Sequence, residues 1–274
     1  VTANVRKILS EYLACGIDPE KAAIYVQSDV KEVLELYLYL NMNAYLGELQ
    51  RVTSFKEKAR KQPENVNAGL LTYPTLMAAD ILIHRADKVP VGKDQEQNME
   101  MARKFARRFN TIYGVEFFPE PQSYSFGGDA IKVPGLDGSG KMGKSEGNAI
   151  YLIDDAATIR KKVMKAVTDS GPTQPNSEKP EAIANLFTML KIVSSADTYD
   201  YFNEKYNACE IRYGDLKKQL AEDIVNFTSP IRERILAYAA DTEYMDKVAR
   251  EGAEKARASA DKTIREVRKI IGFN

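Results

Sequence analysis

The chain is poor in the residues that bind metals. Its 274 residues include one histidine, two cysteines and no tryptophan. Cys15 and Cys209 are far apart in the sequence and cannot provide the four ligands of a structural zinc or iron–sulfur site. So few cysteines in so long a chain are typical of a protein of the reducing cytosol. We therefore expect a cytoplasmic protein with no zinc and no iron–sulfur cluster.

Charge and hydropathy exclude further classes of protein. Lys and Arg together number 39, as do Asp and Glu, so the formal net charge is zero. Without a bulk basic charge, any RNA binding has to depend on a local patch. No apolar run reaches the length of a membrane-spanning helix, and the opening segment is a charged helix rather than a signal peptide. We expect no membrane partner.

The first half of the chain has an α/β pattern. A helix is predicted over residues 1–13 and a strand over residues 22–26. Segment 34–49 is rich in leucine and tyrosine and poor in charge, so it is either core or a subunit interface. Helices that alternate with short β-branched runs indicate an α/β architecture. The first of two expected domains covers residues 1–150.

The second half, residues 151–274, is predicted to be almost wholly helical. Asp154 and Asp155 can cap its first helix, and a helical pattern over 211–240 is expected to break around Ser229–Pro230. The last helix, 244–271, mixes lysines and arginines with acidic residues. Mixed signs usually indicate a solvated face rather than an RNA contact.

A loop rich in glycine and lysine runs from Pro134 to Ser145. Lys141 and Lys144 can face one anion only if the backbone bends, which the glycines at 138, 140 and 143 allow. Two ammonium groups beside a triphosphate can stabilise charge that develops in a transition state. Alone, such a loop is more often a solvated surface loop.

A second motif places a carboxylate among apolar residues. Tyr73, Met77 and Asp80 fall at i, i+4 and i+7 of a helix, with Pro74 expected in its first turn. A buried carboxylate without a partner costs on the order of several kcal/mol. Two partners are possible for Asp80: His84, one turn later, or a donor on a ligand.

The third motif, Val89 to Gln95, is predicted to form a strand, a tight turn at Gly92 and the start of a helix at Asp94. Open α/β sheets place their ligands at such strand-to-helix turns. The sequence therefore predicts a ligand site here.

Taken together, these motifs resemble those of the tryptophanyl-tRNA synthetases, which are class I aminoacyl-tRNA synthetases. Lys141–Ser145 is similar to the lysine signature of the class, and segments 69–81 and 89–95 are similar to motifs of the family. Shorter matches occur at 54–58 and 166–170, so the resemblance covers nearly the whole chain. It implies a Rossmann-like parallel-sheet catalytic domain followed by an all-helical anticodon-binding domain.

The resemblance also implies roles for single residues. Asp80 would accept the indole N–H of L-tryptophan. The other tryptophan-binding residues would be Tyr73, Met77, Ile81 and Gln95. The ATP-binding residues would be Lys58, Gly92, Lys93, Asp94, Val133, Lys141, Met142, Gly143, Lys144 and Ser145. Among these, Lys141, Lys144 and Ser145 would be catalytic, acting with Mg²⁺ on the phosphates of ATP.

The chain departs from the family pattern in two places. The family usually has serine where this chain has Gly143, so the loop loses one hydroxyl. The family's ATP motif on its first strand and helix is missing, because the single histidine, His84, lies elsewhere. We therefore expect an N-terminally incomplete nucleotide fold that does not form an adenylate alone.

The expected function is ATP-dependent activation of L-tryptophan and its transfer to tRNA(Trp) by a homodimeric ligase. Met77 favours tryptophan over tyrosine. In tyrosyl enzymes the corresponding position looks like a glutamine, which would favour a phenolic ligand, whereas a thioether suits the wall of an aromatic pocket. Three alternatives stay open: a tyrosyl-tRNA synthetase, a non-catalytic RNA-binding fragment, and another nucleotidyltransferase of the same fold.

Overall fold

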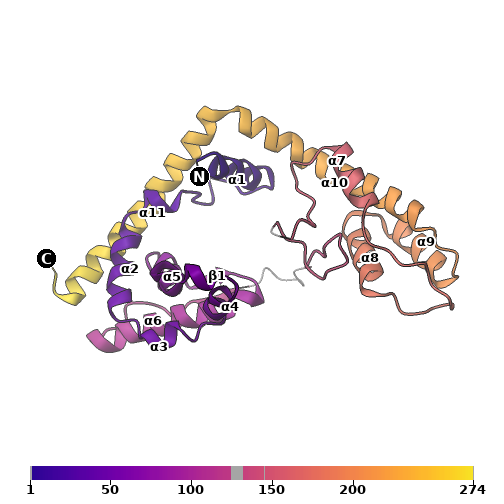
Figure 1. Ribbon diagram of the computed structural model, residues 1–274. Helices are drawn as coiled ribbons and strands as arrows, with labels where there is room; N and C mark the ends of the chain where they lie inside the picture. Colours follow the sequence, from indigo (N-terminus) through magenta and orange to yellow (C-terminus); the bar gives the residue numbers. More distant parts are fainter. Residues whose placement is uncertain (1, 125–131, 145, 274) are drawn as a thin grey trace. The chain divides into compact units, whose positions relative to one another are not determined.

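The computed structural model describes residues 2–124, 132–144 and 146–273 (Figure 1). The chain forms two compact units. Unit 1 comprises Val1–Asp18 and Ile131–Met245, and unit 2 comprises Pro19–Ala130 and Asp246–Asn274. Within the described ranges, no helix is long and apolar enough to cross a membrane. These units are defined by contacts, whereas the predicted domains 1–150 and 151–274 are defined by expected function. That functional division stays a prediction.

Unit 1 is helical. Its helices are α1 (Thr2–Ala14), α7 (Ala156–Met164), α8 (Glu181–Val193), α9 (Ala196–Asn207), α10 (Tyr213–Ala240) and the first residues of α11 (Thr242–Ile271). Helix α10 contacts α1, α7 and α8, and its Leu216 and Leu220 are fully buried. The predicted cap is confirmed, since the Asp155 carboxylate accepts a hydrogen bond from Thr158 N at 2.7 Å.

The predicted break at Ser229–Pro230 is wrong. Helix α10 continues through Pro230, and the chain leaves the helix only at Asp241 (orange segment in Figure 1). A proline removes one backbone hydrogen bond and usually kinks or ends a helix. Here apolar residues on both sides of Pro230, such as Val225 and Ile235, are buried, so tertiary packing outweighs the local preference.

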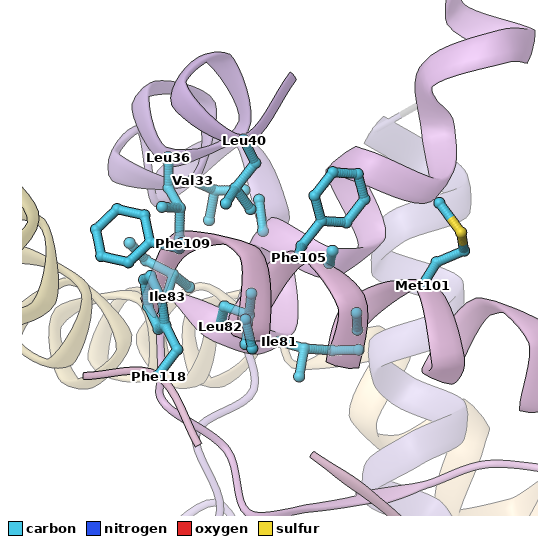
Figure 2. Packing of buried hydrophobic residues seen from close by; sticks show 14 of the residues in the cluster. Val33, Leu36, Leu40, Ile81, Leu82, Ile83, Met101, Phe105, Phe109 and Phe118 are labelled. Carbon is cyan, nitrogen blue, oxygen red and sulfur yellow. The ribbon is translucent and has the colours of Figure 1, made fainter. Parts of the chain in front are cut away.

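Unit 2 packs helices around one apolar core. Its α-helices are α2 (Glu32–Met42), α3 (Leu46–Leu49), α4 (Thr53–Lys61), α5 (Ala68–Leu82), α6 (Glu96–Tyr113) and the rest of α11. Short 3₁₀ turns are η1 (Gln27–Asp29), η2 (Pro63–Asn65) and η3 (Lys93–Gln95). Figure 2 shows Leu36 and Leu40 of α2 packed with Leu82 of α5 and with Phe105 and Phe109 of α6.

Two short strands in unit 2 pair in parallel across a helix. Strand β1 (Lys88–Pro90) precedes α6 and β2 (Gln122–Tyr124) follows it, with Val89 opposite Ser123. A parallel pair requires a crossover, and α6 provides it by burying Met101, Phe105 and Phe109 in the core. This βαβ arrangement agrees with the predicted α/β pattern.

The strand predicted over residues 22–26 is not found. Val26 has extended backbone angles, but this segment joins no sheet in the described part of the chain and leads into η1. Its Ile24 backbone lies instead against Gly252 of α11. Extended, β-branched sequence alone does not determine a strand, because a strand also needs a partner for its backbone.

The leucine- and tyrosine-rich segment 34–49 provides core on one side only. Leu36 and Leu40 of α2 are fully buried, whereas Leu34, Leu38 and Met42 are 61%, 53% and 77% exposed. The two interpretations of this segment therefore apply to opposite faces of the same helix. The exposed face is the one that an interface would use.

Candidate active site

Helix α5 presents the predicted carboxylate face in unit 2. Tyr73, Met77 and Asp80 are all partly buried on this helix. The helix begins earlier than predicted, because the side chain of Asn67 accepts a hydrogen bond from Leu70 N and caps it. Pro74 therefore lies inside the helix and not in its first turn, which corrects the prediction.

Asp80 is half-buried and is held by an amide. The Nε2 atom of Gln27 lies 2.8 Å from both carboxylate oxygens of Asp80. Burial raises the pKa of Asp80, and the hydrogen bond from Gln27 opposes that shift. Among the described residues, no lysine or arginine forms an ion pair with this carboxylate. In the described part of the chain, the partner of Asp80 is therefore an uncharged amide, and no cation neutralises the carboxylate.

His84 does not pair with Asp80. Its Nε2 lies 2.9 Å from the hydroxyl of Tyr25, and its Nδ1 lies 3.1 Å from Oγ of Ser259. Burial lowers the pKa of His84, which favours the neutral ring. Both ring nitrogens have other partners, so the protein partner of Asp80 is Gln27, which neither alternative named, and the ligand donor stays a prediction.

Tyr73 lies beside a cation. Its hydroxyl forms a hydrogen bond with Oγ of Ser54, and Nζ of Lys58 lies 4.9 Å from the centre of its ring. Lys58 also lines a cavity of about 420 Å³ together with Lys61, Gln62, Asn65, Asn67 and Leu70. Two lysines and three amide side chains around one cavity are suited to an anion.

The turn between β1 and α6 follows the strand as predicted, but α6 begins at Glu96, after the 3₁₀ turn η3, rather than at Asp94. Gln95 N donates to the carbonyl oxygen of Gly92 at 3.0 Å, and Asn98 Nδ2 donates to Oε1 of Gln95 at 2.9 Å. A Cβ atom at Gly92 would lie 2.7 Å from Oδ1 of Asp94, so a larger residue would displace that carboxylate. The side chain of Lys93 lies outside the described part of the structure.

The glycine–lysine loop of unit 1 is organised around Asn148. The side chain of Asn148 is 6% exposed. It donates to Asp137 Oδ1 at 2.9 Å and to the Lys141 carbonyl at 3.1 Å, and it accepts from Gly143 N at 2.9 Å. Lys141 and Lys144 are exposed on the loop that these bonds hold. Ser145, predicted to be catalytic, lies outside the described residues.

Glycine serves this loop at particular positions. Gly138 has a φ angle of +85°, which disfavours residues with a Cβ atom. At Gly135 a Cβ atom would lie 2.2 Å from Nδ2 of Asn148. A Cβ atom at Gly143 would meet Cγ of Glu146 at 3.2 Å, so the family's serine requires only a small side-chain adjustment there.

An apolar cavity adjoins the same loop. Met142 N donates to the Val133 carbonyl at 2.9 Å, and both residues line a cavity of about 230 Å³. Its other lining residues are Ile150, Leu152, Met189, Ile192, Val193, Ile224, Phe227 and Thr228. Such a lining suits a flat, apolar ring system.

Comparisons with known proteins identify the family of the chain. A family model described as tRNA synthetases class I (W and Y) matches residues 1–229. The tryptophan–tRNA ligase of Porphyromonas gingivalis is 78% identical over 273 residues, which cover 100% of this chain and 84% of that protein. The chain belongs to the tryptophanyl-tRNA synthetase family.

Two further tryptophanyl-tRNA synthetases support this assignment. The tryptophan–tRNA ligase of Listeria monocytogenes is 41% identical over 98% of this chain and 81% of that protein. The solved structure of the tryptophanyl-tRNA synthetase of Campylobacter jejuni, complexed with ADP and tryptophan, is similar with a TM-score of 0.84. It is 34% identical, and the match covers 98% of this chain and 82% of that chain.

Membership of the tryptophanyl-tRNA synthetase family confirms the resemblance predicted from the motifs, and with it the fold class. The tyrosyl alternative is not favoured. The roles of single site residues stay predictions. Sequence reasoning missed Gln27 and Asn148. Gln27 had no signal except its place after a β-branched run, whereas Asn148 follows the lysine motif closely enough to have been considered.

Proposed function

We propose that the protein activates L-tryptophan with ATP to give tryptophanyl-adenylate and transfers the amino acid to tRNA(Trp). The observation that carries this proposal is the carboxylate of Asp80, half-buried on α5 with an amide rather than a cation as its partner. Such a group is suited to accept the N–H of an uncharged ring. Two relatives that are named tryptophan–tRNA ligases agree with that chemistry.

The amino acid would contact one face of α5. Asp80 accepts the indole N–H, while Met77 and Ile81 contact the ring. Tyr73 and Gln95 bind the α-ammonium group. A ring without the N–H leaves the half-buried carboxylate of Asp80 with Gln27 as its donor and no donor on the ligand, and this penalty disfavours such a ring.

The phosphates of ATP, bound as its Mg²⁺ complex, would meet the lysines. One oxygen of the tryptophan carboxylate attacks the α-phosphorus, so an O–P bond forms while the O–P bond to pyrophosphate breaks. Lys141 and Lys144 stabilise the charge that develops on the pyrophosphate, and Lys58 contributes through the cavity beside α4. Gly92, Lys93 and Asp94 approach the nucleotide, and the apolar cavity at Val133 suits its adenine ring. The carboxylate is already a nucleophile, so no covalent residue is needed.

The remaining partners are macromolecular. The helical part, residues 151–274, binds the anticodon region of tRNA(Trp). The exposed apolar face of α2 and the residues that follow it form a homodimer contact in the cytoplasm. This face comprises Leu34, Leu38, Met42, Tyr45 and Leu46.

Amino-acid-dependent pyrophosphate exchange by the full-length protein tests this function. We expect exchange with tryptophan and far less with tyrosine. Asp80→Asn should weaken tryptophan binding about 10–100-fold, because a hydrogen bond to a charged group contributes about 1.5–3 kcal/mol. Asp87→Asn is the control, since Asp87 is an exposed carboxylate of the same unit.

Three outcomes would contradict the proposal. Exchange that prefers tyrosine would indicate the tyrosyl activity. Unchanged tryptophan binding by Asp80→Asn would remove the residue that carries the assignment. Absence of exchange with either amino acid, together with tight tRNA binding, would indicate a non-catalytic RNA-binding protein.

A further inference from the structure

Hydrogen bonds from Tyr25 and Gln27 tie the segment that carries them to α5 and to the turn that follows it. Tyr25 bonds to His84, and Gln27 bonds to Asp80. Gln27 is the first residue of the 3₁₀ turn η1, and His84 lies in the turn that directly follows α5. The segment that carries Gln27 is therefore held at two points, one on the helix that carries Asp80 and one just beyond the end of that helix.

The C-terminal helix holds this segment from another side. The carbonyl oxygen of Ile24 approaches Gly252 of α11 so closely that a Cβ atom there would lie 1.9 Å from it. Ser259, two turns further along α11, bonds to His84. Gln27 itself is exposed, but the backbone that precedes it is fixed by packing.

The Gln27 amide leaves acceptor capacity on the Asp80 carboxylate for a further donor. Nε2 lies 2.8 Å from each oxygen of Asp80, close to the line that bisects the carboxylate. A carboxylate has about four lone-pair sites, so each oxygen can accept another donor. We propose that Gln27 is a positioning residue that holds the Asp80 carboxylate for the indole N–H and thereby sets the preference for tryptophan. This inference depends on the proposed function.

The hydrogen bond from Gln27 also acts on the pKa of Asp80, although burial is the larger effect. Burial raises the pKa of Asp80, and the hydrogen bond from Gln27 is the larger of the two effects that lower it. The titratable groups that face Asp80 within the described ranges are His84 and Tyr25. The pKa of His84 is lowered and that of Tyr25 is raised, both chiefly by burial, so both are neutral near pH 7.

The direction of the pH effect follows from these shifts. Only the ionised carboxylate accepts the indole N–H with full strength, so tryptophan binding weakens as the pH falls through the pKa of Asp80. Replacing Gln27 by an isosteric apolar residue removes a bond that favours the anion. The pKa of Asp80 then rises further, and binding is lost at a higher pH than in the wild type.

The experiment measures tryptophan affinity of the full-length protein by calorimetry across acidic to neutral pH. Gln27→Met should weaken binding about 3–10-fold at neutral pH, the range for one solvent-exposed hydrogen bond. It should also move the acidic midpoint of binding upwards and leave the KM for ATP unchanged. Gln219→Met is the matched control, because Gln219 donates to Asp223 at 2.9 Å in the same exposed fashion but belongs to unit 1.

A second variant separates positioning from folding. Gln27→Glu keeps the size of the side chain but places a second carboxylate beside Asp80, so the pair should hold a proton and the midpoint should move further upwards. Weaker binding with an unchanged midpoint in both variants would mean that Gln27 has only a structural role, and it would overturn the inference. If Gln27→Met binds tryptophan with wild-type affinity, the inference is also overturned, although the proposed function stands. A wild-type protein that does not bind tryptophan would instead overturn the proposed function.

Discussion

Gly252 of α11 is the position where adding a single methyl group should have the clearest effect on the stability of the protein. It is buried inside the helix, where alanine would normally be preferred. An added Cβ atom would lie 1.9 Å from the oxygen, 2.7 Å from the carbonyl carbon and 2.9 Å from the nitrogen of Ile24. These are backbone atoms, so no rotamer change can relieve the overlap.

The balance of energies predicts destabilisation by Gly252→Ala. Helix propensity favours alanine over glycine by about 0.5–1 kcal/mol. Non-bonded carbon and oxygen atoms need about 3.5 Å, so α11 and the Ile24 backbone must separate by roughly 1.5 Å. Overpacking of this kind costs about 1–3 kcal/mol in a close-packed interior. We expect a net loss of about 1–2 kcal/mol in the free energy of unfolding.

Chemical denaturation of Gly252→Ala and Gly214→Ala checks this expectation. Gly214 lies in the first turn of α10 with nothing within 4 Å of an added Cβ atom, so its alanine variant should be more stable by up to about 0.5–1 kcal/mol. The Gly252 variant should also bind tryptophan more weakly, because Ile24 precedes Gln27. If both substitutions stabilise the protein equally, the close approach of α11 to Ile24 is refuted.

Two further predictions concern charged groups. Lys144→Ala should lower the rate of adenylate formation about 10²–10³-fold, as for a lost oxyanion donor, and leave tryptophan binding intact. Pyrophosphate exchange measures the rate, and a near-normal value would remove Lys144 from the mechanism. Arg268→Met should destabilise unit 2, because Arg268 bonds to both oxygens of Glu35 at 2.7 and 2.5 Å and holds the pKa of that carboxyl below its usual range. A carboxyl group whose pKa is lowered in the folded state stabilises the protein at pH values above its unfolded-state pKa, and this stabilisation is lost as the pH falls through its folded-state pKa. The loss of stability caused by Arg268→Met should therefore be complete at neutral pH and vanish in acid. A deficit in urea midpoint that is independent of pH would contradict this account.

The motifs could be found from the sequence because their chemistry is local. Glycine turns, a lysine pair and an aspartate cap each depend on residues a few positions apart, and the cap at Asp155 is present as predicted. The two prolines were misjudged for different reasons. Pro74 was placed in the first turn because the cap at Asn67 was missed, whereas Pro230 lies in a helix that buried residues such as Val225 and Ile235 keep intact despite the lost hydrogen bond.

The partner of Asp80 could not be predicted because it is distant in sequence. His84 was the natural candidate at one helical turn, whereas Gln27 lies 53 residues away. The two are brought together only when segment 24–27 packs between α5 and α11, which no local pattern specifies. The same holds for His84, whose second partner, Ser259, lies 175 residues away.

Helix α11 explains why the contacts and the predicted functions divide the chain differently. Its mixed charges suggested a solvated face, and the structure gives it two faces: Ala256, Ala260, Ile264 and Val267 are buried in the core of unit 2. Through Ser259 and Gly252 the same helix supports the segment that carries Gln27. A helix assigned by sequence to the predicted RNA-binding half is therefore part of the packing behind the proposed amino-acid site. The region around residue 150 can divide roles in the reaction, but the chain cannot be divided there without also removing the support for Asp80.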